Sequence, residues 1–536
     1  MPLTTGHGPL TTNNFALATL PRPVLAPILD GIAGQEAFAL DVGSLPRLTR
    51  HTYRVEVLHM ALWGGLVAML EGGIAAVIVA KTFHGTPFQI SVVRATPVVT
   101  NMLSIIWGMM AVTRPKIPLL TIACTGAAVA MAATALVPAD YSWSAWMFAA
   151  QMVIARIFLS GTATLRTAIW KANYPTAVRG RLAGRLQLQG SLSRLATLYL
   201  VSSVLDLAPG KANLWVPRIL VDWLGLDASQ PYWQFPHWLV EWGGPNAYRW
   251  IYPLLALLGG VSILLLQLIR VRGDRQLNRQ MLETGELGPI SLEARAVEPY
   301  SLTAVLNPAL APLRRMVEIL KRDKAFRVYQ TAQMFSGAAN LLIDPILVII
   351  FVNQLGMNYT SSTAMLDMLP IVLSLATITL WARLYDRWGL PKYRVINGGF
   401  WTIRMILTAV AVACTQYLLD MPHGREIVIG IFVFAQVLNG IAQGGGGIAW
   451  NLGHLHFARP EEAELYMGIH ATLTGLRGWL GFVGAPLYVW GGWPVFAAAA
   501  VMSLIGFVLY FYGMTTRFGL GGVDVARTEA VAARQG

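Results

Sequence analysis

The sequence has little charge and almost no cysteine. Asp, Glu, Lys and Arg make up 12% of its 536 residues, whereas hydrophobic residues make up 55%. A soluble globular chain carries about 25% charged residues, which cover its surface. Because this chain has only about half of that share, much of its surface has to face lipid instead of water. The composition therefore predicts a membrane protein.

Further absences exclude other classes. The two cysteines, Cys124 and Cys414, lie in separate apolar segments, so a disulfide framework is not expected. Residues 1–54 lack a basic stretch followed by an apolar core, which predicts a cytoplasmic tail and not a cleavable signal peptide. No Gly-x-x-x-x-Gly-Lys-Ser/Thr sequence occurs, so ATP is not expected to drive the protein. We expect neither an enzyme nor a bound cofactor.

Long apolar runs are abundant. A helix that crosses a bilayer needs about 20 mostly apolar residues. The sequence predicts an all-α membrane protein with twelve transmembrane helices. They cover residues 56–80, 88–112, 118–137, 143–166, 187–207, 249–269, 328–353, 362–382, 395–418, 427–450, 466–489 and 493–513.

The basic residues gather on one side of these predicted helices. Most of the 40 Lys and Arg lie in the two termini and in the loops that follow the even-numbered helices. The opposite loops hold only Lys81, Lys211, Arg218 and Arg425. Positive loops mark the cytoplasmic side, so both termini are predicted to be cytoplasmic, in a plasma membrane such as a bacterial inner membrane. Because the charge is spread over short turns, the net charge of +13 does not predict a nucleic-acid partner.

Two of the predicted loops are long. Residues 270–327 are predicted to be cytoplasmic and begin with a basic cluster that suits anionic lipid headgroups. Residues 208–248 are predicted to lie outside and carry five Trp, which prefer the membrane interface. For this outer loop we expect an amphipathic hairpin resting on the membrane, with a lid over the solute as the alternative.

An internal repeat divides the chain. Gly64 matches Gly337, an offset of 337 − 64 = 273 residues. At the same offset Glu71 pairs with Asp344, Arg94 with Asp367, Pro97 with Pro370, Arg114 with Arg387 and Pro118 with Pro391; Trp170 then pairs with Trp450 and Gly184 with Gly468 at larger offsets. Chance apolar similarity rarely aligns charged, Pro and Trp positions in order. The repeat predicts two six-helix halves, 55–269 and 328–513, joined by a linker at 270–327 and followed by a cytoplasmic tail at 514–536.

This plan resembles the major facilitator superfamily of transporters. The most specific match is the segment 382–389, which is similar to the family's loop signature and contains Asp386, Arg387 and Gly389. The copy after the second predicted helix keeps Arg114 but has Thr113 in place of the Asp. The resemblance implies that these loop residues act in conformational change, by alternating access, and do not bind solute. A merely solvated turn is the alternative.

A second partial match lies in the fourth predicted helix. Arg156 is followed by Gly161, which resembles an Arg and Gly that the family often has there. In proton-coupled members that Arg is tied to proton movement, so the resemblance implies a coupling role for Arg156. The Gly-Pro signature of the family's drug/proton antiporters is absent, since residues 187–207 contain no Pro.

Two acidic residues lie inside predicted spans. A charge at the bilayer centre costs roughly 2.5–3.5 kcal/mol and normally faces a cavity or a partner. Glu71 and its repeat mate Asp344 are therefore candidates for binding a proton or another coupling ion. Structural pairing with a buried Arg is the alternative.

Five arginines also lie inside predicted spans: Arg94, Arg156, Arg194, Arg404 and Arg477. Against Glu71, Asp344 and Asp367 they leave an excess of 5 − 3 = 2 positive charges. Because Arg holds carboxylate and phosphate groups well, we expect an anionic solute, although each Arg taken alone is more often structural. The solute-binding candidates are Arg94, Arg194, Asp367, Arg404 and Arg477, together with the amides Gln436, Asn439 and Gln443.

The leading hypothesis is a secondary active transporter of a small polar or anionic solute, linked to protons. Its partners would be membrane lipids, the solute and a proton or other coupling ion. A non-transporting membrane binding or assembly protein with the same fold is the alternative, and a lipid-handling flippase is a third class. His454 and His456 match no metal-ligand spacing, so no metal site is expected.

Overall fold

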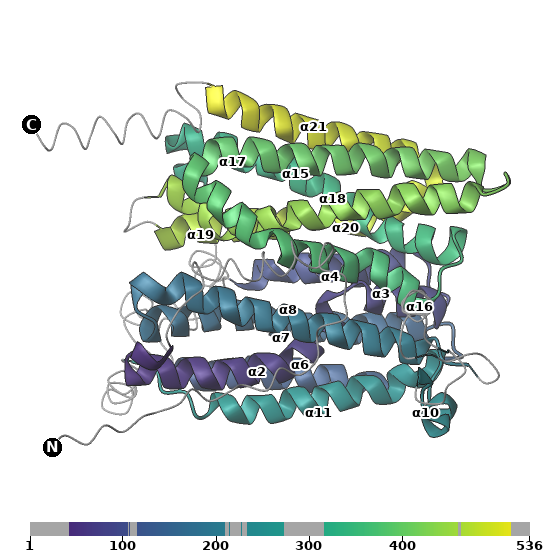
Figure 1. Ribbon diagram of the computed structural model, residues 1–536, viewed down its shortest axis with the longest axis horizontal. Helices are drawn as coiled ribbons and strands as arrows, with labels where there is room; N and C mark the ends of the chain where they lie inside the picture. Colours follow the sequence, from purple (N-terminus) through teal and green to yellow (C-terminus); the bar gives the residue numbers. More distant parts are fainter. Residues whose placement is uncertain are drawn as a thin grey trace, which may run out of the picture. The chain divides into compact units, whose positions relative to one another are not determined.

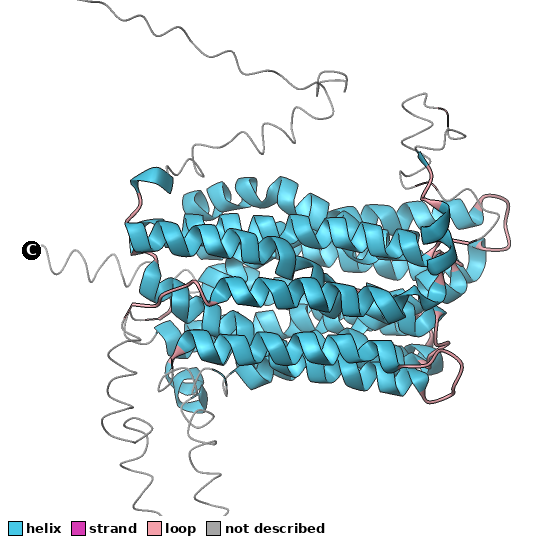
Figure 2. Cartoon of the chain, turned by 90° about the horizontal axis from the view of Figure 1, so that it is seen from below, coloured by secondary structure: helices cyan, strands magenta, loops and turns pink. Residues whose placement is uncertain are grey.

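Helices make up nearly all of the regular structure. The computed structural model describes residues 42–104, 107, 115–208, 214, 227, 233–272, 316–458 and 463–515. Within these ranges there is no strand, and one isolated bridge joins Leu214 to Gln234 (Figure 2). The all-α prediction is therefore confirmed for the described residues.

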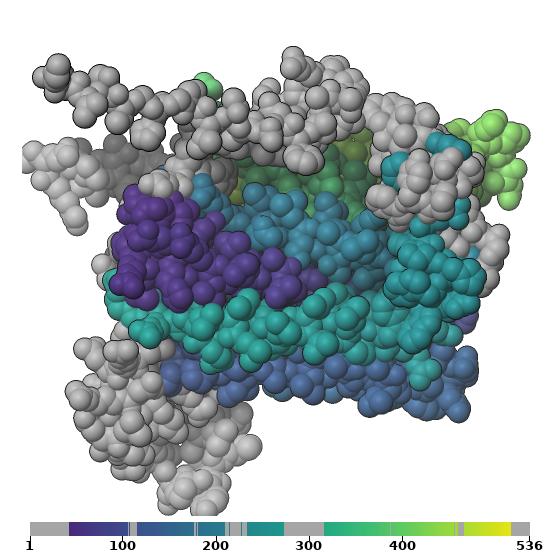
Figure 3. Space-filling model, turned by 60° about the horizontal axis from the view of Figure 1, so that its bottom comes forward, coloured from purple at the N-terminus to yellow at the C-terminus, as the bar shows by residue number. Residues whose placement is uncertain are grey.

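The helices before residue 272 form a first group, which we call the N group. Its members are α2 (Arg47–Glu71), α3 (Ile74–Lys81), α4 (Pro87–Val99) with η2 (Thr100–Leu103), α6 (Lys116–Ala132) with η3 (Ala133–Leu136), α7 (Ser144–Asn173), α8 (Thr176–Leu205) and α11 (Tyr248–Leu266). Helix α2 packs between α8 and α11, and α6 packs on α7 and α11 (Figure 1). Figure 3 shows the face on which α2 and α11 lie side by side.

The helices after residue 316 form a second group, the C group. Its members are α15 (Lys324–Ile349) with the π-helical turn η6 (Ile350–Gln354), α16 (Tyr359–Thr363), the π-helical turn η7 (Ala364–Met368), α17 (Leu369–Leu418), α18 (Gly424–Leu452), η8 (Gly453–His456), α19 (Ala463–Arg477), α20 (Leu480–Gly491) and α21 (Pro494–Thr515). Helix α17 packs on α18 and α21, and α15 packs on α20 and α21. A kink divides α17 at Gly389, whose φ of +66° is a backbone conformation that favours glycine.

Many of these helices can cross a membrane. Among the described residues, eight are long and apolar enough, or nine if α2 and α3, which meet at a bend of 46°, count as one span. Their outer faces are apolar, as shown by Val129 on α6 and Leu264 on α11, which are 63% and 69% exposed. Such faces suit lipid, so the chain is a multi-pass membrane protein.

Every predicted span overlaps one or more of the helices. Some of these helices, however, are too short or too polar to cross a membrane by themselves. Helices α4, α19 and α20 have only 13, 15 and 12 residues. Helix α8 is long but carries Arg179, Arg181, Arg185 and Arg194. The number of twelve spans and the orientation of the termini stay predictions.

The two groups are joined at the end where α3 and α8 finish. Lys81 Nζ donates to the carbonyl oxygen of Met357 at 2.9 Å. The carboxylate of Asp206 accepts hydrogen bonds from the backbone N–H groups of Tyr359 (2.8 Å) and Thr360 (2.7 Å). A residue of the N group therefore caps the N-terminus of α16 in the C group, where a negative charge is favourable.

The apolar core is shared over only part of the length. One large cluster contains residues of both groups, such as Ile78 and Val348. Three smaller clusters belong to one group each: one around Leu45 near the start of α2, and two in the C group, around Phe326 at the start of α15 and around Trp381 on α17. The groups therefore share a core near the joined end, and each has a core of its own where α2 and α15 begin.

Several predicted features lie wholly or partly outside the described residues. In the loop 208–248 the structure describes the short helix α10 (His237–Trp242), where Trp238 and Trp242 are 63% and 67% exposed. Arg114, most of the linker 270–327 and most of the tails 1–54 and 514–536 lie outside, although residues 47–54 of the first tail belong to α2. Of the cysteines, both free, Cys124 is buried and Cys414 is partly exposed.

Candidate functional site

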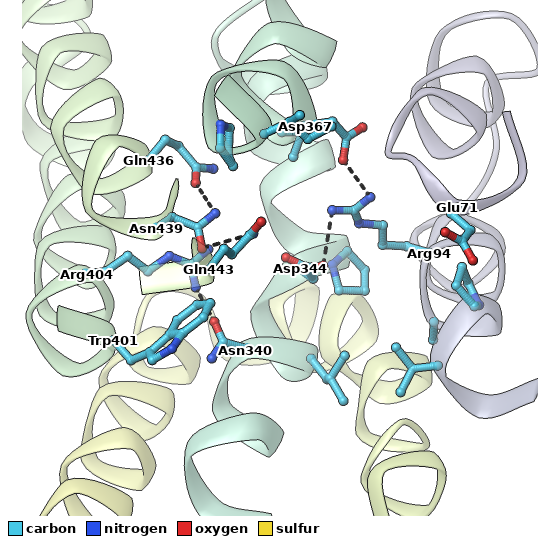
Figure 4. Close-up of a pocket in the computed structure, with 18 of the residues that line it drawn as sticks. Glu71, Arg94, Asn340, Asp344, Asp367, Trp401, Arg404, Gln436, Asn439 and Gln443 are labelled. Carbon is cyan, nitrogen blue, oxygen red and sulfur yellow. Dashed lines mark hydrogen bonds and ion pairs between the residues drawn. The ribbon is translucent and has the colours of Figure 1, made fainter. Parts of the chain in front are cut away.

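A polar cavity of about 260 Å³ lies between the two groups. The N group contributes side chains from the end of α2, from α4 and from α8, and the C group contributes side chains from α15, η7, α17 and α18 (Figure 4). Nine of the predicted site residues line it: Glu71, Arg94, Arg194, Asp344, Asp367, Arg404, Gln436, Asn439 and Gln443. Ligand pockets usually measure about 300–1,000 Å³, so this cavity fits a small solute.

Arg94 connects the two groups across the cavity. Its Nη2 lies 3.2 Å from Asp344 Oδ2 on α15, and its Nη1 lies 3.3 Å from Asp367 Oδ1 in η7. Asp367 also accepts a hydrogen bond from the backbone N–H of Gly73, at the break between α2 and α3. One guanidinium group therefore holds together α4, α15 and η7, and through Asp367 it fixes the bend after α2.

Glu71 forms a second ion-pair cluster within the N group. Its Oε1 lies 2.7 Å from Arg156 Nη1, and its Oε2 lies 3.5 Å from Arg194 Nη1. Arg156 also donates to the carbonyl oxygen of Pro97 at 2.7 Å. Arg156 therefore lies behind Glu71 and does not line the cavity, whereas Glu71 and Arg194 do.

A row of amides forms the wall opposite Arg94 (Figure 4). On α18, Asn439 Nδ2 donates to Gln436 Oε1 at 2.7 Å, and Gln443 Nε2 lies 3.4 Å from Asn439 Oδ1. The spacing of three and four residues places all three amides on one face of the helix. Gly444 lets this helix approach α17, because a Cβ there would lie 2.7 Å from Thr377 Oγ1. The wall therefore offers both donors and acceptors.

Arg404 is a cavity cation that forms no direct ion pair with a carboxylate among the described residues. Its side chain is buried, with 1% of the residue exposed, and its Nη1 donates to Asn340 Oδ1 at 2.6 Å. Its Nε has no hydrogen-bond partner. Sequence reasoning missed Asn340 and Trp401, which also line the cavity. Helical spacing was an available signal, because Asn340 precedes Asp344 by four residues and Trp401 precedes Arg404 by three.

The remaining candidates lie elsewhere. Arg477 does not line the cavity but donates from Nη1 to the carbonyl oxygen of Gln333 at 2.6 Å. Three arginines and three acids line the cavity, so the excess is 3 − 3 = 0, or 4 − 3 = 1 with Arg156 behind Glu71, and not the two positive charges that the sequence suggested. Arg387 is exposed beside the kink at Gly389. The side chain of Asp386 is not among those that the structure describes.

Two buried polar networks, both unpredicted, lie away from the cavity. The N-group network consists of Glu56, His59, Arg166, Trp170 and Tyr174. The C-group network consists of Tyr329, Gln333, Arg394, His470, Arg477 and Tyr510. Residues such as Glu56 and Arg394 stand at the edges of the predicted spans, where a charge is unremarkable in a sequence.

The Tyr174 hydroxyl shows the effect of such burial. It follows the last residue of α7 and donates to Glu56 Oε2 at 2.6 Å. Burial, and to a lesser degree the neighbouring Glu56 carboxylate, raise the pKa of Tyr174. The hydroxyl therefore stays protonated and keeps its role as a donor.

Comparison with known proteins finds solved structures with a similar fold but no related sequence. No family model and no curated protein matches the sequence. Solved structures do match. A D-xylose–proton symporter is 13% identical, with 86% of this chain and 96% of that chain covered and a TM-score of 0.57. A bacterial homolog of the human lysosomal transporter Spinster, inward-facing and unoccupied, is 11% identical, with 87% and 97% covered and a TM-score of 0.56.

A POT family transporter in complex with 5-aminolevulinic acid is 10% identical, with 87% and 95% covered and a TM-score of 0.57. These neighbours are transporters, so the resemblance predicted from the sequence is confirmed at the level of the fold. At identities this low the likeness concerns the fold alone.

Proposed function

We propose that this protein is a secondary active transporter that moves a small solute with an anionic group across the membrane. The observation that carries the proposal is Arg404, a buried guanidinium on a cavity wall that forms no direct ion pair among the described residues, since the nearby Asp344 is paired with Arg94. A buried cation normally requires a counter-charge, and the solute would supply it. The amides of α18 would bind the polar remainder of the solute. A symporter and a substrate-bound transporter among the fold neighbours support this class of function.

The proposed mechanism is alternating access between two six-helix halves, 55–269 and 328–513, with twelve spans, the linker 270–327 and both termini on the cytoplasmic side of a plasma membrane. In that orientation the joined end faces outward, and the ends with separate cores face the cytoplasm. Moving to the opposite state would require the contacts of Arg94 with Asp344 and Asp367 and those of Asp206 with α16 to break. The loop residues Arg114, Asp386, Arg387 and Gly389 are proposed to hold the cytoplasmic side closed in that second state.

Proton linkage would act through the acid–arginine pairs. A proton on Glu71 would neutralise the partner of Arg194, and a proton on Asp344 would do the same for Arg94. The released guanidinium group would then face the cavity and attract the anionic solute. Loading of the proton would thereby favour loading of the solute, with Arg156 keeping Glu71 in place.

The test uses purified protein in detergent and in proteoliposomes. Thermal stability is measured against matched anionic and neutral members of sugars, amino acids, organic acids and nucleosides, since a ligand of the folded state raises the Tm. An anionic series should stabilise the wild type but not Arg404→Gln, and the same compounds should enter proteoliposomes under a proton gradient. Arg425→Gln is the matched control, because Arg425 binds the carbonyl oxygen of Leu355 away from the cavity.

Three other outcomes would change the proposal. Equal stabilisation by neutral and anionic analogues would contradict an anionic solute. Uptake that survives both Glu71→Gln and Asp344→Asn would exclude proton linkage through these residues and favour facilitated diffusion. Stable binding without any flux would favour the membrane assembly protein.

A further inference from the structure

The C-group network places two guanidinium groups against one residue. Arg394 Nη2 donates to the side-chain oxygen of Gln333, and it also lies 3.2 Å from the Tyr329 hydroxyl. Arg477 Nη1 donates to the backbone oxygen of the same glutamine at 2.6 Å. The two cations therefore lie side by side although they come from α17 and α19.

No acid balances these two charges in the described part of the chain. The hydrogen bonds of both arginines end on amide, hydroxyl or carbonyl oxygens. The Arg394 guanidinium also lies over the rings of Tyr329 and Tyr510, at 5.3 Å and 5.1 Å from their centres. Ring faces attract a cation but carry no net charge. Two like charges in a protein interior without a counter-ion are strongly unfavourable.

The same network also contains buried donors that have no hydrogen-bond partner. The Nε atoms of Arg394 and Arg477 are buried and have no hydrogen-bond partner. The same is true of His470 Nε2, and this residue is only 1% exposed. His470 Nδ1 lies 3.2 Å from the side-chain amide of Gln330, and when that amide donates, Nε2 carries the proton. Arg477 keeps some exposed surface, so the network is not sealed.

We propose that the C-group network binds a small inorganic anion of the size of chloride, between Arg394, Arg477 and His470. Such an ion accepts hydrogen bonds from several directions and needs little space, which fits donors crowded among aromatic rings. Neither arginine lines the solute cavity, so this site is separate from that of the transported solute. The ion would serve as a fixed counter-charge within the C group, and the proposal does not depend on transport.

The probe is chloride, compared with gluconate at equal ionic strength. For the wild type we expect the Tm to rise by about 2 °C or more between about 1 and about 100 mM chloride, because the ion binds the folded state only. Bromide should act like chloride. Gluconate is too large for the site and should have no such effect.

The decisive variant is Gln333→Glu. Its carboxylate would stand where the Gln333 oxygen now accepts from Arg394 and from Tyr510 (2.5 Å), and it would supply from within the chain the charge that the ion supplies. In gluconate its Tm should reach that of the wild type in chloride, and its response to chloride should disappear. Arg477→Gln should weaken the response as well.

Arg404→Gln is the matched control. It removes a buried cation from the solute cavity, outside the C-group network, and it should keep the full chloride response. Equal Tm values of the wild type in chloride and gluconate would overturn the proposal. So would a full chloride response in both Gln333→Glu and Arg477→Gln. Because solute uptake is measured separately, either proposal can fail without the other.

Discussion

The two buried networks differ in the origin of their negative charge. In the N-group network the carboxylate of Glu56 lies 4.0 Å from Arg166 and accepts hydrogen bonds from Trp170 and Tyr174 at 2.6 Å each. In the C-group network Tyr329 stands at the repeat-related position, since 329 − 56 = 273, and it contacts Arg394. The N-group network thus balances a buried cation with its own acid, whereas the C-group network has two cations and no acid partner among the described residues.

This difference shows that a duplicated helix position can hold an acid in one copy and a tyrosine in the other, beside buried arginines in both. Burying a cation beside a carboxylate fixes the balance permanently. Burying it beside tyrosine rings and an amide leaves the balance to solvent or to an ion, and it makes stability depend on the medium. The N-group network should therefore be insensitive to the anion in the buffer and the C-group network sensitive to it.

Removal of the internal acid should have the largest effect. Glu56→Gln keeps an acceptor for Trp170 and Tyr174 but leaves Arg166 without its carboxylate. Breaking a buried ion pair in this way should lower the free energy of unfolding by about 3–5 kcal/mol, in chloride and gluconate alike. Denaturation of the purified protein measures the change.

The exposed acid Glu241 supplies the control, because its side chain is 62% exposed and Glu241→Gln should cost less than about 0.5 kcal/mol. A Glu56→Gln protein as stable as the wild type would show that Arg166 does not depend on this acid and would remove the contrast between the networks.

Removal of a cation from the C group should cost less. Arg394→Gln loses hydrogen bonds and two ring contacts but also relieves the repulsion from Arg477. We expect a loss of about 2 kcal/mol in chloride and a smaller loss in gluconate. If Arg394→Gln lowered the free energy of unfolding in gluconate as much as Glu56→Gln does, the C-group network would not lack a counter-charge.

The smallest effect concerns pH. His454 stands at the position related to Tyr174, since 454 − 174 = 280, and burial lowers its pKa to about 4. The folded state then prefers the neutral ring, so the contribution of His454 to stability is constant above pH 6.5 and falls as the pH drops from 6.5 towards 4.

By pH 6 this loss should already reach about 1 kcal/mol. Comparison of the pH profiles of the wild type and His454→Gln isolates it, because all other titrating groups are shared. Parallel profiles would show that His454 is not buried in the neutral form.

Much of the fold could be predicted from the sequence because lipid requires long apolar helices. Every predicted run overlaps a helix, and the repeat of Gly, Pro and charged positions predicted two related sets. The breaks within the predicted spans were not predictable in the same way. The bend between α2 and α3 is held by Asp367, a residue 294 positions from Gly73 in the chain, so no local pattern reveals it.

The cavity residues were largely predictable because a charged side chain inside a membrane span normally faces a cavity or a charged partner. Nine candidates line the cavity, yet their pairings were not predictable, since Arg156 reaches Glu71 over 85 residues of chain. Arg477 shows the limit of the argument. Its charge indicated a special role, but helix spacing alone did not tell whether it faces the cavity or the interior of the C group.

The contact between Arg94 and Asp367 has a consequence for the origin of the chain. These residues are repeat mates, 367 − 94 = 273 positions apart, and they touch across the two groups. In the proposed two-half arrangement, mates that touch must straddle the two-fold axis. A dimer of identical ancestral subunits would present the same residue from both sides, so two arginines or two aspartates would repel each other there. Only two copies that diverge after duplication can supply one positive and one negative residue, which makes this ion pair a mark of that divergence.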